Sequence, residues 1–199
     1  MRRDLSFTVG ALSLLGLAAC GQAASPDGDA APSGAANVIS ETAASEDALA
    51  YGARARARLF GPDGERIGDV IAWQGRDGVL IEIAARDLPL GGHGVHIHGV
   101  GACDDVGVYT ASGGHVGKDD GPHGLLHPDG AHRGDLPNLH VTAAGTTRVE
   151  FFSPLISVSE LTDADGAALI IHTERDDWQT QPIGGAGARI ACARFRPKT

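Results

Sequence analysis

The sequence predicts an all-β protein in which eight short strands form an antiparallel sandwich or barrel. Two observations support this fold class. The chain is rich in glycine, with 29 residues, and poor in aromatic residues, at 5%, which favours short strands joined by many turns. Its apolar residues occur in short runs, several of them with a period of two, and no long leucine-rich stretch has the period of a helix.

The first three predicted strands are separated by clear turn sequences. Residues 53–59 read ARARARL, so small apolar side chains alternate with cations and one face of this strand is solvated. The sequence GPDG at 61–64 predicts a turn into a strand at 66–73, and RDG at 76–78 predicts a turn into a strand at 79–85. The remaining strands are predicted at residues 94–100, 139–143, 147–152, 168–173 and 189–195.

Residues 1–19 resemble the signal peptide of a bacterial lipoprotein. Arg2 and Arg3 precede an apolar run at 5–17, which is too short to span a bilayer at about 20 residues per crossing. The sequence LAACG at 17–21 resembles a lipobox, which implies cleavage before Cys20 and lipidation of its thiol. The protein is then expected in the bacterial cell envelope, held to the outer membrane on its periplasmic side through Cys20. An ordinary signal peptide with a chance cysteine is the alternative.

The rest of the chain divides into a tether and one domain. Residues 20–50 contain Cys20 and then mostly Ala, Ser, Gly, Pro and acidic residues. Such a segment cannot bury enough apolar surface to offset the entropy lost on ordering, so its composition predicts a flexible tether. Residues 51–199 are long enough for a single core. Of the three cysteines, Cys103 and Cys192 remain as a pair in an oxidising compartment once Cys20 is assigned to lipid. The formal net charge of −9 excludes nucleic acid as an expected partner, because phosphate binding needs a concentrated basic surface.

The nine histidines suggest a metal site. His96 and His98 are two apart on a predicted strand, so both rings leave the same face. By itself this pair would more often be exposed or hydrogen-bonded in a core than bound to a metal. The stretch from 101 to 138, however, is long and rich in Gly, Asp and His, and such long loops are usually functional.

Further candidate ligands lie in that loop and on a later strand. Three imidazoles and a carboxylate, from His115, His123, His132 and Asp135, form the closed tetrahedral set expected for structural Zn²⁺. His172 follows an apolar run, and a buried ring there needs a partner for each nitrogen. Imidazole-rich sites suit copper and zinc better than magnesium or calcium.

These residues lie in motifs that resemble those of the copper/zinc superoxide dismutases. The sequence GHGVHIH at 92–98 resembles the first family signature. The metal loop is matched by GGH at 113–115, PHG at 122–124 and HRGDLPN at 132–138, and the C-terminal signatures by IH at 171–172 and GARIAC at 187–192. The resemblance covers residues 51–195. It implies an eight-stranded antiparallel Greek-key sandwich or flattened barrel with a long metal-binding loop.

The resemblance also implies an antioxidant enzyme, a superoxide dismutase. It would convert the superoxide anion into O₂ and H₂O₂ by Cu(II)/Cu(I) cycling at a histidine-bridged Cu/Zn centre, with one copper and one zinc per subunit. The copper ligands would be His96, His98, His115 and His172. The zinc ligands would be His115, His123, His132 and Asp135.

Other roles follow by position from the same resemblance. His115 would bridge both ions and act in catalysis together with Arg189, which would stand beside the open copper position and attract a small anion. Asp176 would bind one copper histidine, His96, and one zinc histidine, His123, from outside the metal sites. His93 would be a structural histidine near copper. The Cys103–Cys192 disulfide would tie the metal loop to the last strand, while His127 and His140 have no role in the pattern.

Two other functions and several open points remain. A non-catalytic copper/zinc-binding or metal-buffering envelope lipoprotein would need the ligands but not Arg189, and an inactive interaction module would be expected to have lost ligands, of which none is missing.

Lys118, Arg133 and Arg175 are further candidates for steering an anion. The chain has VGK at 116–118 where family members commonly have Phe-Asn-Pro, and its segment 173–188 is short. A monomer and a homodimer are both compatible with the sequence.

Overall fold

The computed structural model describes residues 52–197. The predicted signal peptide (1–19), the predicted lipidation site Cys20 and the predicted tether (20–50) lie outside the described residues. So do Tyr51 and residues 198–199. Within residues 52–197, no helix has the length and apolarity that crossing a membrane requires.

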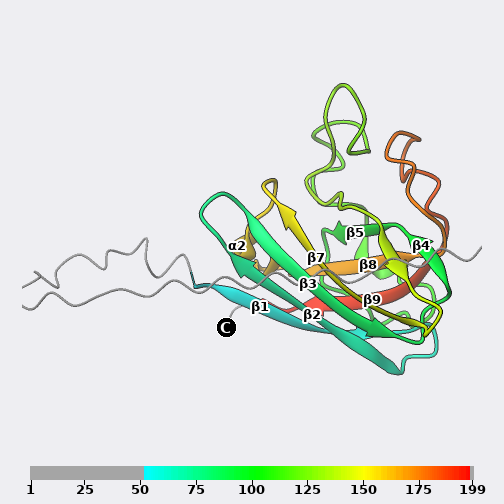
Figure 1. Cartoon of the computed structure of the whole chain (residues 1–199). Coiled ribbons are helices and arrows are strands. Elements are labelled where there is room, and N and C mark those ends of the chain that lie inside the picture. Colours follow the sequence, from blue (N-terminus) through cyan, green and yellow to red (C-terminus); the bar gives the residue numbers. More distant parts are fainter. Residues whose placement is uncertain (1–51, 198–199) are drawn as a thin grey trace, which may run out of the picture. The chain divides into compact units, whose positions relative to one another are not determined.

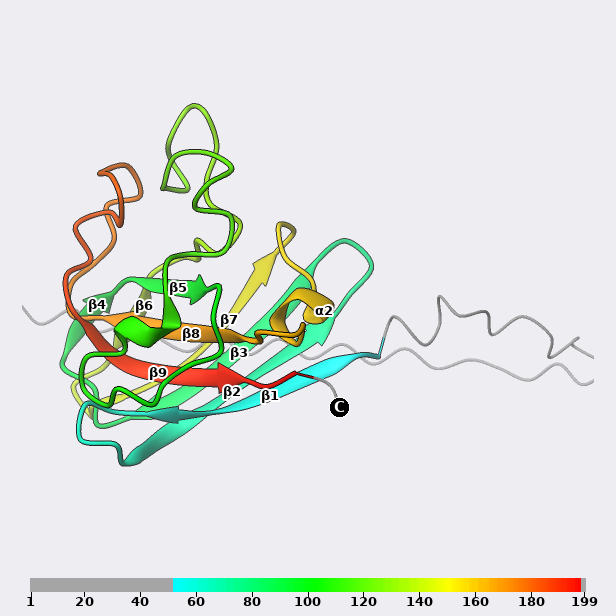
Figure 2. The same cartoon turned by 180° about the vertical axis from the view of Figure 1, so that it is seen from behind.

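Nine strands make up the fold of the described residues (Figures 1 and 2). They are β1 (Arg54–Phe60), β2 (Arg66–Gln74), β3 (Val79–Arg86), β4 (Gly91–His93), β5 (Val95–His98), β6 (Leu139–Val141), β7 (Thr146–Ser153), β8 (Ala167–His172) and β9 (Arg189–Phe195). Seven of them form one curled antiparallel sheet in the order β5-β8-β9-β1-β2-β3-β7, and β4 pairs with β6. The chain therefore crosses from β3 in one half of the sheet to β5 at its far edge.

The predicted all-β fold is confirmed, with two corrections to its elements. The predicted strand at 94–100 is divided, because Gly91–His93 forms a separate strand, β4, and β5 ends at His98. Two glycines give β4 no side-chain pattern, and only its backbone pairing with β6 defines it. The prediction also contained no helix, whereas Val158–Leu161 forms a single helical turn, α2. Ser157 and Glu160 cap its first turn reciprocally, which is the capping box that this sequence carries.

The core lies inside the curled sheet. β1 and β3 alternate buried and exposed residues, as their sequence pattern requires. β8, in contrast, is buried along its whole length, because Ile170 on its other face packs with Tyr109 and Cys192 beneath the loop that follows β5. Burial on both faces explains why the run before His172 is continuously apolar.

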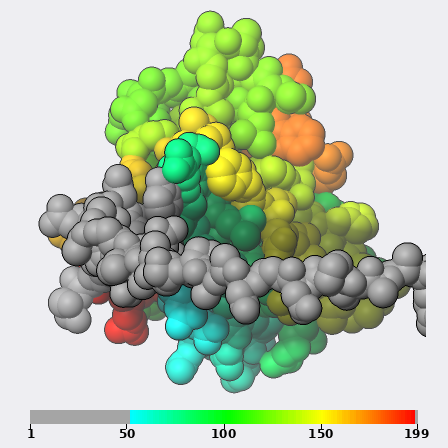
Figure 3. Space-filling model, turned by 60° about the vertical axis from the view of Figure 1, so that its left-hand side comes forward, coloured from blue at the N-terminus to red at the C-terminus, as the bar shows by residue number. Residues whose placement is uncertain are grey.

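Two long connections lie together beyond one side of the sheet (Figures 1 and 3). The later part of the loop from 99 to 138, in yellow-green, and the loop from 173 to 188, in orange, project away from β1 and β2. The start of the first loop instead packs beside the end of β1, where the Tyr109 hydroxyl donates to Gly61 O. The first loop pairs along the free edge of β5: Val116 N donates to Ile97 O at 2.9 Å, and Ile97 N donates to Gly134 O at 2.8 Å. A Cβ on Gly134 would lie 2.2 Å from Ile97 O, so only glycine permits this approach.

Candidate metal centre

Four buried histidines from three parts of the chain converge beside β5. His96 and His98 project from β5, and His172 ends the neighbouring strand β8. His115 comes from the long loop, whose backbone forms a bridge with His98. One ring nitrogen from each of the four lies within 4.8 Å of those of the others.

The outer ring nitrogens of three of these histidines are held by fixed acceptors. His96 Nε2 donates to Asp176 Oδ2 at 2.7 Å, His98 Nδ1 to Gly113 O at 2.8 Å, and His172 Nδ1 to Gly187 O at 3.1 Å. Each hydrogen bond fixes the tautomer and leaves the lone pair of the other nitrogen directed inward.

The inner nitrogens have no hydrogen-bond partner. They are His96 Nδ1, His98 Nε2, His115 Nε2 and His172 Nε2. Each buried polar atom without a partner costs about 1–3 kcal/mol, so four such atoms in one place indicate that a ligand completes the site. Four imidazole nitrogens fit copper.

A second set of ligand atoms meets on the other side of His115. His115 Nδ1 and His123 Nδ1 lie 2.9 and 3.0 Å from Asp135 Oδ1. His132 Nδ1 lies 3.2 Å from His115 Nδ1 and 3.6 Å from Asp135 Oδ1. Ligand atoms around a tetrahedral zinc ion with bonds of about 2.0–2.1 Å are roughly 3.3 Å apart. The spacing of these atoms fits zinc, and the ring of His115 faces both sets.

His96 lies close to both sets, and its hydrogen bonding decides between them. One of its ring nitrogens is within 4.8 Å of ligand atoms of His115, His123 and Asp135. Its Nε2, however, is bonded to Asp176, and only its Nδ1 is unpartnered, like the inner nitrogens of the first set. We therefore group His96 with the first set and His132 with the second.

Asp176 lies between the two sets and bonds to a histidine of each. Its carboxylate accepts from His96 at 2.7 Å and from His123 Nε2 at 3.1 Å. Its backbone is held on both sides by Asn138, whose Nδ2 donates to Asp176 O and whose Oδ1 accepts from Asp176 N, both at 2.9 Å. Gly184 packs against the carboxylate with a φ of +63°, and a Cβ there would lie 1.7 Å from Asp176 Oδ1.

Burial and neighbouring charges set the protonation of the cluster. Burial lowers the pKa of His96 to about 4 and that of His172 to about 3, and it also lowers the pKa of His98. These rings are therefore neutral ligands at neutral pH. At His123, burial lowers the pKa, but hydrogen bonds to Asp135 and Asp176 outweigh it and raise the pKa to about 9 in the metal-free cluster. A metal ion at Nδ1 would take the place of that proton.

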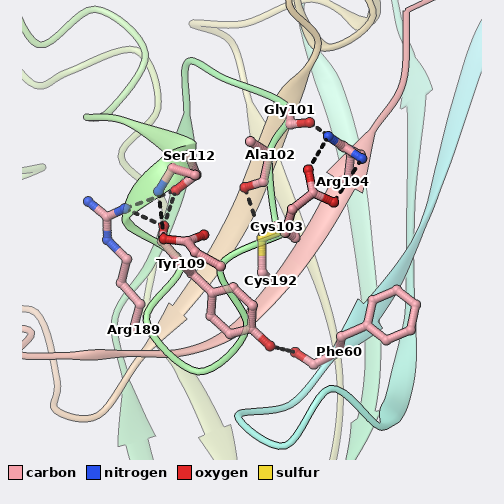
Figure 4. Close-up of a disulfide and its surroundings, with 12 residues drawn as sticks. Phe60, Gly101, Ala102, Cys103, Tyr109, Ser112, Arg189, Cys192 and Arg194 are labelled. Atoms are coloured by element: carbon pink, nitrogen blue, oxygen red, sulfur yellow. Dashed lines mark hydrogen bonds and ion pairs between the residues drawn. A yellow bond between two sulfur atoms is a disulfide. The ribbon is translucent and has the colours of Figure 1, made fainter.

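Arg189, at the start of β9, is positioned by oxygen atoms of the long loop (Figure 4). Its Nη1 donates to Tyr109 O at 2.5 Å and to Ser112 Oγ at 2.9 Å, and its Nη2 donates to Gly113 O at 2.8 Å. None of the described carboxylates forms an ion pair with it. Its charge lowers the pKa of both His98 and His172, which places a largely uncompensated cation beside the first ligand set.

The predicted disulfide is confirmed. Cys103 and Cys192 are bonded, with Cα atoms 5.9 Å apart, and join the start of the long loop to β9 (Figure 4). His93 is buried outside both ligand sets, with its ring nitrogens 2.7 Å from His172 O and 2.9 Å from Pro89 O. His127 is partly exposed and His140 is exposed, and neither joins the cluster.

Sequence reasoning missed the residues that support the site through their backbone or their lack of a side chain. Asn138 ends the motif HRGDLPN, but nothing local in that motif indicates its two bonds to the backbone of Asp176. Gln181 holds the backbone of His123 from both sides, accepting from His123 N and donating to His123 O, both at 2.8 Å. Gly184 and Ser112 carry no pattern that a single sequence reveals, because their importance depends on neighbours distant in the chain.

Comparisons with known proteins agree with this geometry. Residues 67–195 match the family described as copper/zinc superoxide dismutase (SODC). A superoxide dismutase (Cu-Zn) of Caulobacter vibrioides is 40% identical over 137 residues, covering 65% of this chain and 78% of that protein. The superoxide dismutase-like protein YojM of Bacillus subtilis is 35% identical over 188 residues, covering 91% and 90%. The solved structure of the Cu/Zn superoxide dismutase from Brucella abortus superposes with a TM-score of 0.62 at 26% identity, covering 72% of this chain and 99% of that one.

Proposed function

Since the chain belongs to the copper/zinc superoxide dismutase family, we propose that its two ligand sets are the copper and zinc sites of an active dismutase. Copper would be held by His96, His98, His115 and His172. Zinc would be held by His115, His123, His132 and Asp135, with His115 shared. The observation that carries this assignment is the convergence of four buried, unpartnered ring nitrogens on one point.

The protein residues around the copper site have separable tasks in the proposed reaction. Bound copper supplies one-electron chemistry by accepting an electron from one superoxide and giving it to the next, and zinc keeps one oxidation state. Arg189 attracts the superoxide anion and orients it by hydrogen bonds. His115 Nε2 would carry a proton only while it is not bound to copper, and it would give that proton to the peroxide product, whose second proton comes from water. Asp176 keeps the rings of His96 and His123 in place.

The direct test is a superoxide-consumption assay on the full chain loaded with copper and zinc. Activity is expected with both metals and not with zinc alone, since zinc does not change oxidation state. A fully loaded protein without activity would favour the second candidate function, copper and zinc binding or buffering without turnover. The similarity to YojM, which is named only as superoxide dismutase-like, keeps this candidate open.

Replacing Arg189 by alanine is expected to lower the dismutase rate about tenfold or more at low salt, because local cations change the on-rates of anions by roughly 10–10³. Arg189→Lys should retain more activity, since it keeps the charge but loses the paired donors. Metal content is expected to be unchanged, because Arg189 is in neither ligand set. Arg148→Ala, on the outer face of β7, is the control. Equal rates for Arg189→Ala and wild type would exclude this role.

Two of the other candidate cations are already paired with carboxylates and the third stacks on an aromatic ring, so Arg189 is the main unpaired source of attraction beside the copper set. Lys118 bonds to Asp119 at 2.6 Å, and Arg133 forms ion pairs with Asp120 and Glu160. Arg175 lies over the ring of Trp178, 5.4 Å from its centroid. The fall in rate with rising salt should therefore be small once Arg189 is replaced.

Replacing Gly184 by alanine is expected to weaken zinc binding by about 10–100-fold, the usual cost of disturbing an outer partner of a metal ligand. The new Cβ would displace the Asp176 carboxylate and also lie 2.8 Å from His123 Nε2. Gly185→Ala is a matched control, because Gly185 has a similar φ of +68° but open space around its Cα. Both variants carry the same backbone strain, so a competition titration with a zinc chelator isolates the clash. Equal zinc affinities would contradict the proposed role of Asp176.

We propose the cell location from the N-terminal sequence alone. Residues 1–19 would be removed, and lipid on Cys20 would hold the domain in the periplasm. Mass spectrometry of the N-terminal peptide from the native host tests for the lipid, and Cys20→Ala should release the protein from a membrane fraction washed with high salt.

A further inference from the structure

The outer face of β1 carries a row of arginines that the dismutase reaction does not use. Arg54, Arg56 and Arg58 alternate with buried residues and are exposed. None of the three forms a hydrogen bond or an ion pair through its side chain with another described residue. Three like charges on one strand face repel one another. The carboxylate opposite them on β2, Asp69, faces Arg58 but is bonded to Arg66.

A groove of about 780 Å³ runs beside this row. It is lined by the three arginines of β1, by Arg194 and Arg196 at the end of the chain, and by Asp104 as its one described carboxylate. Asp104 is already bonded to Arg194 at 2.9 Å. Phe60 and Val106 add apolar surface. In a protein with a formal net charge of −9, this groove is a concentrated site for anions.

An apolar row lies next to the arginines on the same outer face. Cross-strand pairing places Arg54 opposite Trp73, Trp73 opposite Leu80, and Leu80 opposite Phe152. Directly paired residues point to the same side of a sheet, so Trp73, Leu80 and Phe152 continue the face that Arg54 begins. Phe152 is 55% exposed and Leu80 is 37% exposed. The arginines of β1, which can bind phosphate groups, therefore lie next to aromatic and aliphatic side chains that can enter an apolar phase.

We propose that this outer face, formed by β1, the end of β9 and the row Trp73–Leu80–Phe152, docks on an anionic lipid bilayer. The arginines would bind head-group phosphates, and the apolar row would enter the boundary between head groups and acyl chains. A soluble polyanion would use the arginines but not the apolar row, and for that reason the bilayer is the better partner. The groove shares no residue with either ligand set. The start of the long loop lines the groove, whereas the later part of that loop and the 173–188 loop project away from β1 (Figures 1 and 3). Docking therefore leaves the metal centre accessible to superoxide.

The test is co-sedimentation of the full chain with vesicles of phosphatidylglycerol and phosphatidylcholine, compared with phosphatidylcholine alone, with Cys20→Ala as the common background of every protein compared so that no lipid anchor contributes. Binding is expected only to the anionic vesicles and should weaken as salt rises. The triple variant Arg54→Gln, Arg56→Gln, Arg58→Gln should bind about a hundredfold more weakly, at roughly a fivefold loss per arginine near the surface. It should keep wild-type dismutase activity, which separates this proposal from the proposed function.

A matched control removes three arginines that already have carboxylate partners. Arg66, Arg86 and Arg148 pair with Asp69, Asp87 and Glu82. Their replacement by Gln changes the net charge equally, leaves the unpaired row intact and retains the N-terminal segment, so vesicle binding should fall less than about threefold. If the two triple variants lost vesicle affinity equally, net charge alone would explain the binding and the proposal would be overturned. Failure of the wild type to bind anionic vesicles would overturn it as well.

Insertion of the apolar row is tested by quenching with brominated phosphatidylglycerol. The chain has two tryptophans, and Trp73 lies in the proposed face, whereas Trp178 lies in the 173–188 loop. Tryptophan fluorescence should be quenched in wild type and should lose that quenching in Trp73→Phe. Phe152→Ser should weaken vesicle binding further. Binding to inorganic polyphosphate or single-stranded DNA as tight as to vesicles, without quenching of Trp73, would identify a general polyanion site and overturn bilayer docking.

Discussion

Replacing His98 by alanine is expected to lower dismutase activity by more than about a hundredfold. Disturbing a residue that only supports a metal ligand costs about 10–100-fold, and removing the ligand itself should cost more. His98 Nε2 is one of the four inner nitrogens of the copper set, and no atom of His98 belongs to the zinc set. Copper affinity should fall while zinc is retained. The fold should persist, because the pairing of β5 with β8 uses the backbone of His98 and not its ring.

The measurement combines three readouts on the same preparations. Superoxide consumption gives the rate, elemental analysis gives copper and zinc per chain, and thermal unfolding of the zinc-loaded protein reports on the fold. His140→Ala is the matched control, because His140 is exposed and lies outside both ligand sets. A His98→Ala protein with full activity and a full complement of copper would end the proposed assignment of the copper site.

Replacing both Cys103 and Cys192 by serine is expected to lower the free energy of unfolding by about 4–5 kcal/mol. The two cysteines are 89 residues apart in sequence, and a cross-link closing a loop of this length removes a corresponding chain entropy from the unfolded state. That loss is a large share of the 5–15 kcal/mol that stabilises a typical domain. Urea unfolding of the metal-free protein, extrapolated linearly to water, measures it without the added stabilisation that metal binding contributes.

The same double variant should also lose activity, for a separate reason. The disulfide fixes β9 against the start of the loop whose Tyr109 O, Ser112 Oγ and Gly113 O hold Arg189. Without it, Arg189 and the loop are free to move relative to each other, and the copper-side pocket loses its fixed cation. Wild-type protein reduced with dithiothreitol is the control and should match the double variant. A stability change below about 1 kcal/mol would show that noncovalent packing around Tyr109 holds this region unaided.

The positions of most strands could be predicted because their signals are local. The alternation of residues 53–59 and the turns at 61–64 and 76–78 depend only on neighbouring residues, and β1, β2 and β3 follow them within one or two positions. β4 could not be predicted, since Gly91 and Gly92 acquire their conformation by pairing with β6, about fifty residues later. Helix α2 had a local signal, the capping box of Ser157 and Glu160, but only one turn follows it.

The sequence by itself determined which residue types are available for the metals: histidines and a carboxylate in family motifs, and the two cysteines that remain for a disulfide. Only the tertiary structure decided which ring nitrogens turn inward, because His96, His98 and His172 are oriented by Asp176, Gly113 and Gly187. It also decided that Arg194 and Arg196 join the arginines of β1 at one groove. The physical reason is the same in both cases. A local pattern sets whether a segment is a strand, whereas the meeting of side chains far apart in sequence depends on how the strands pair.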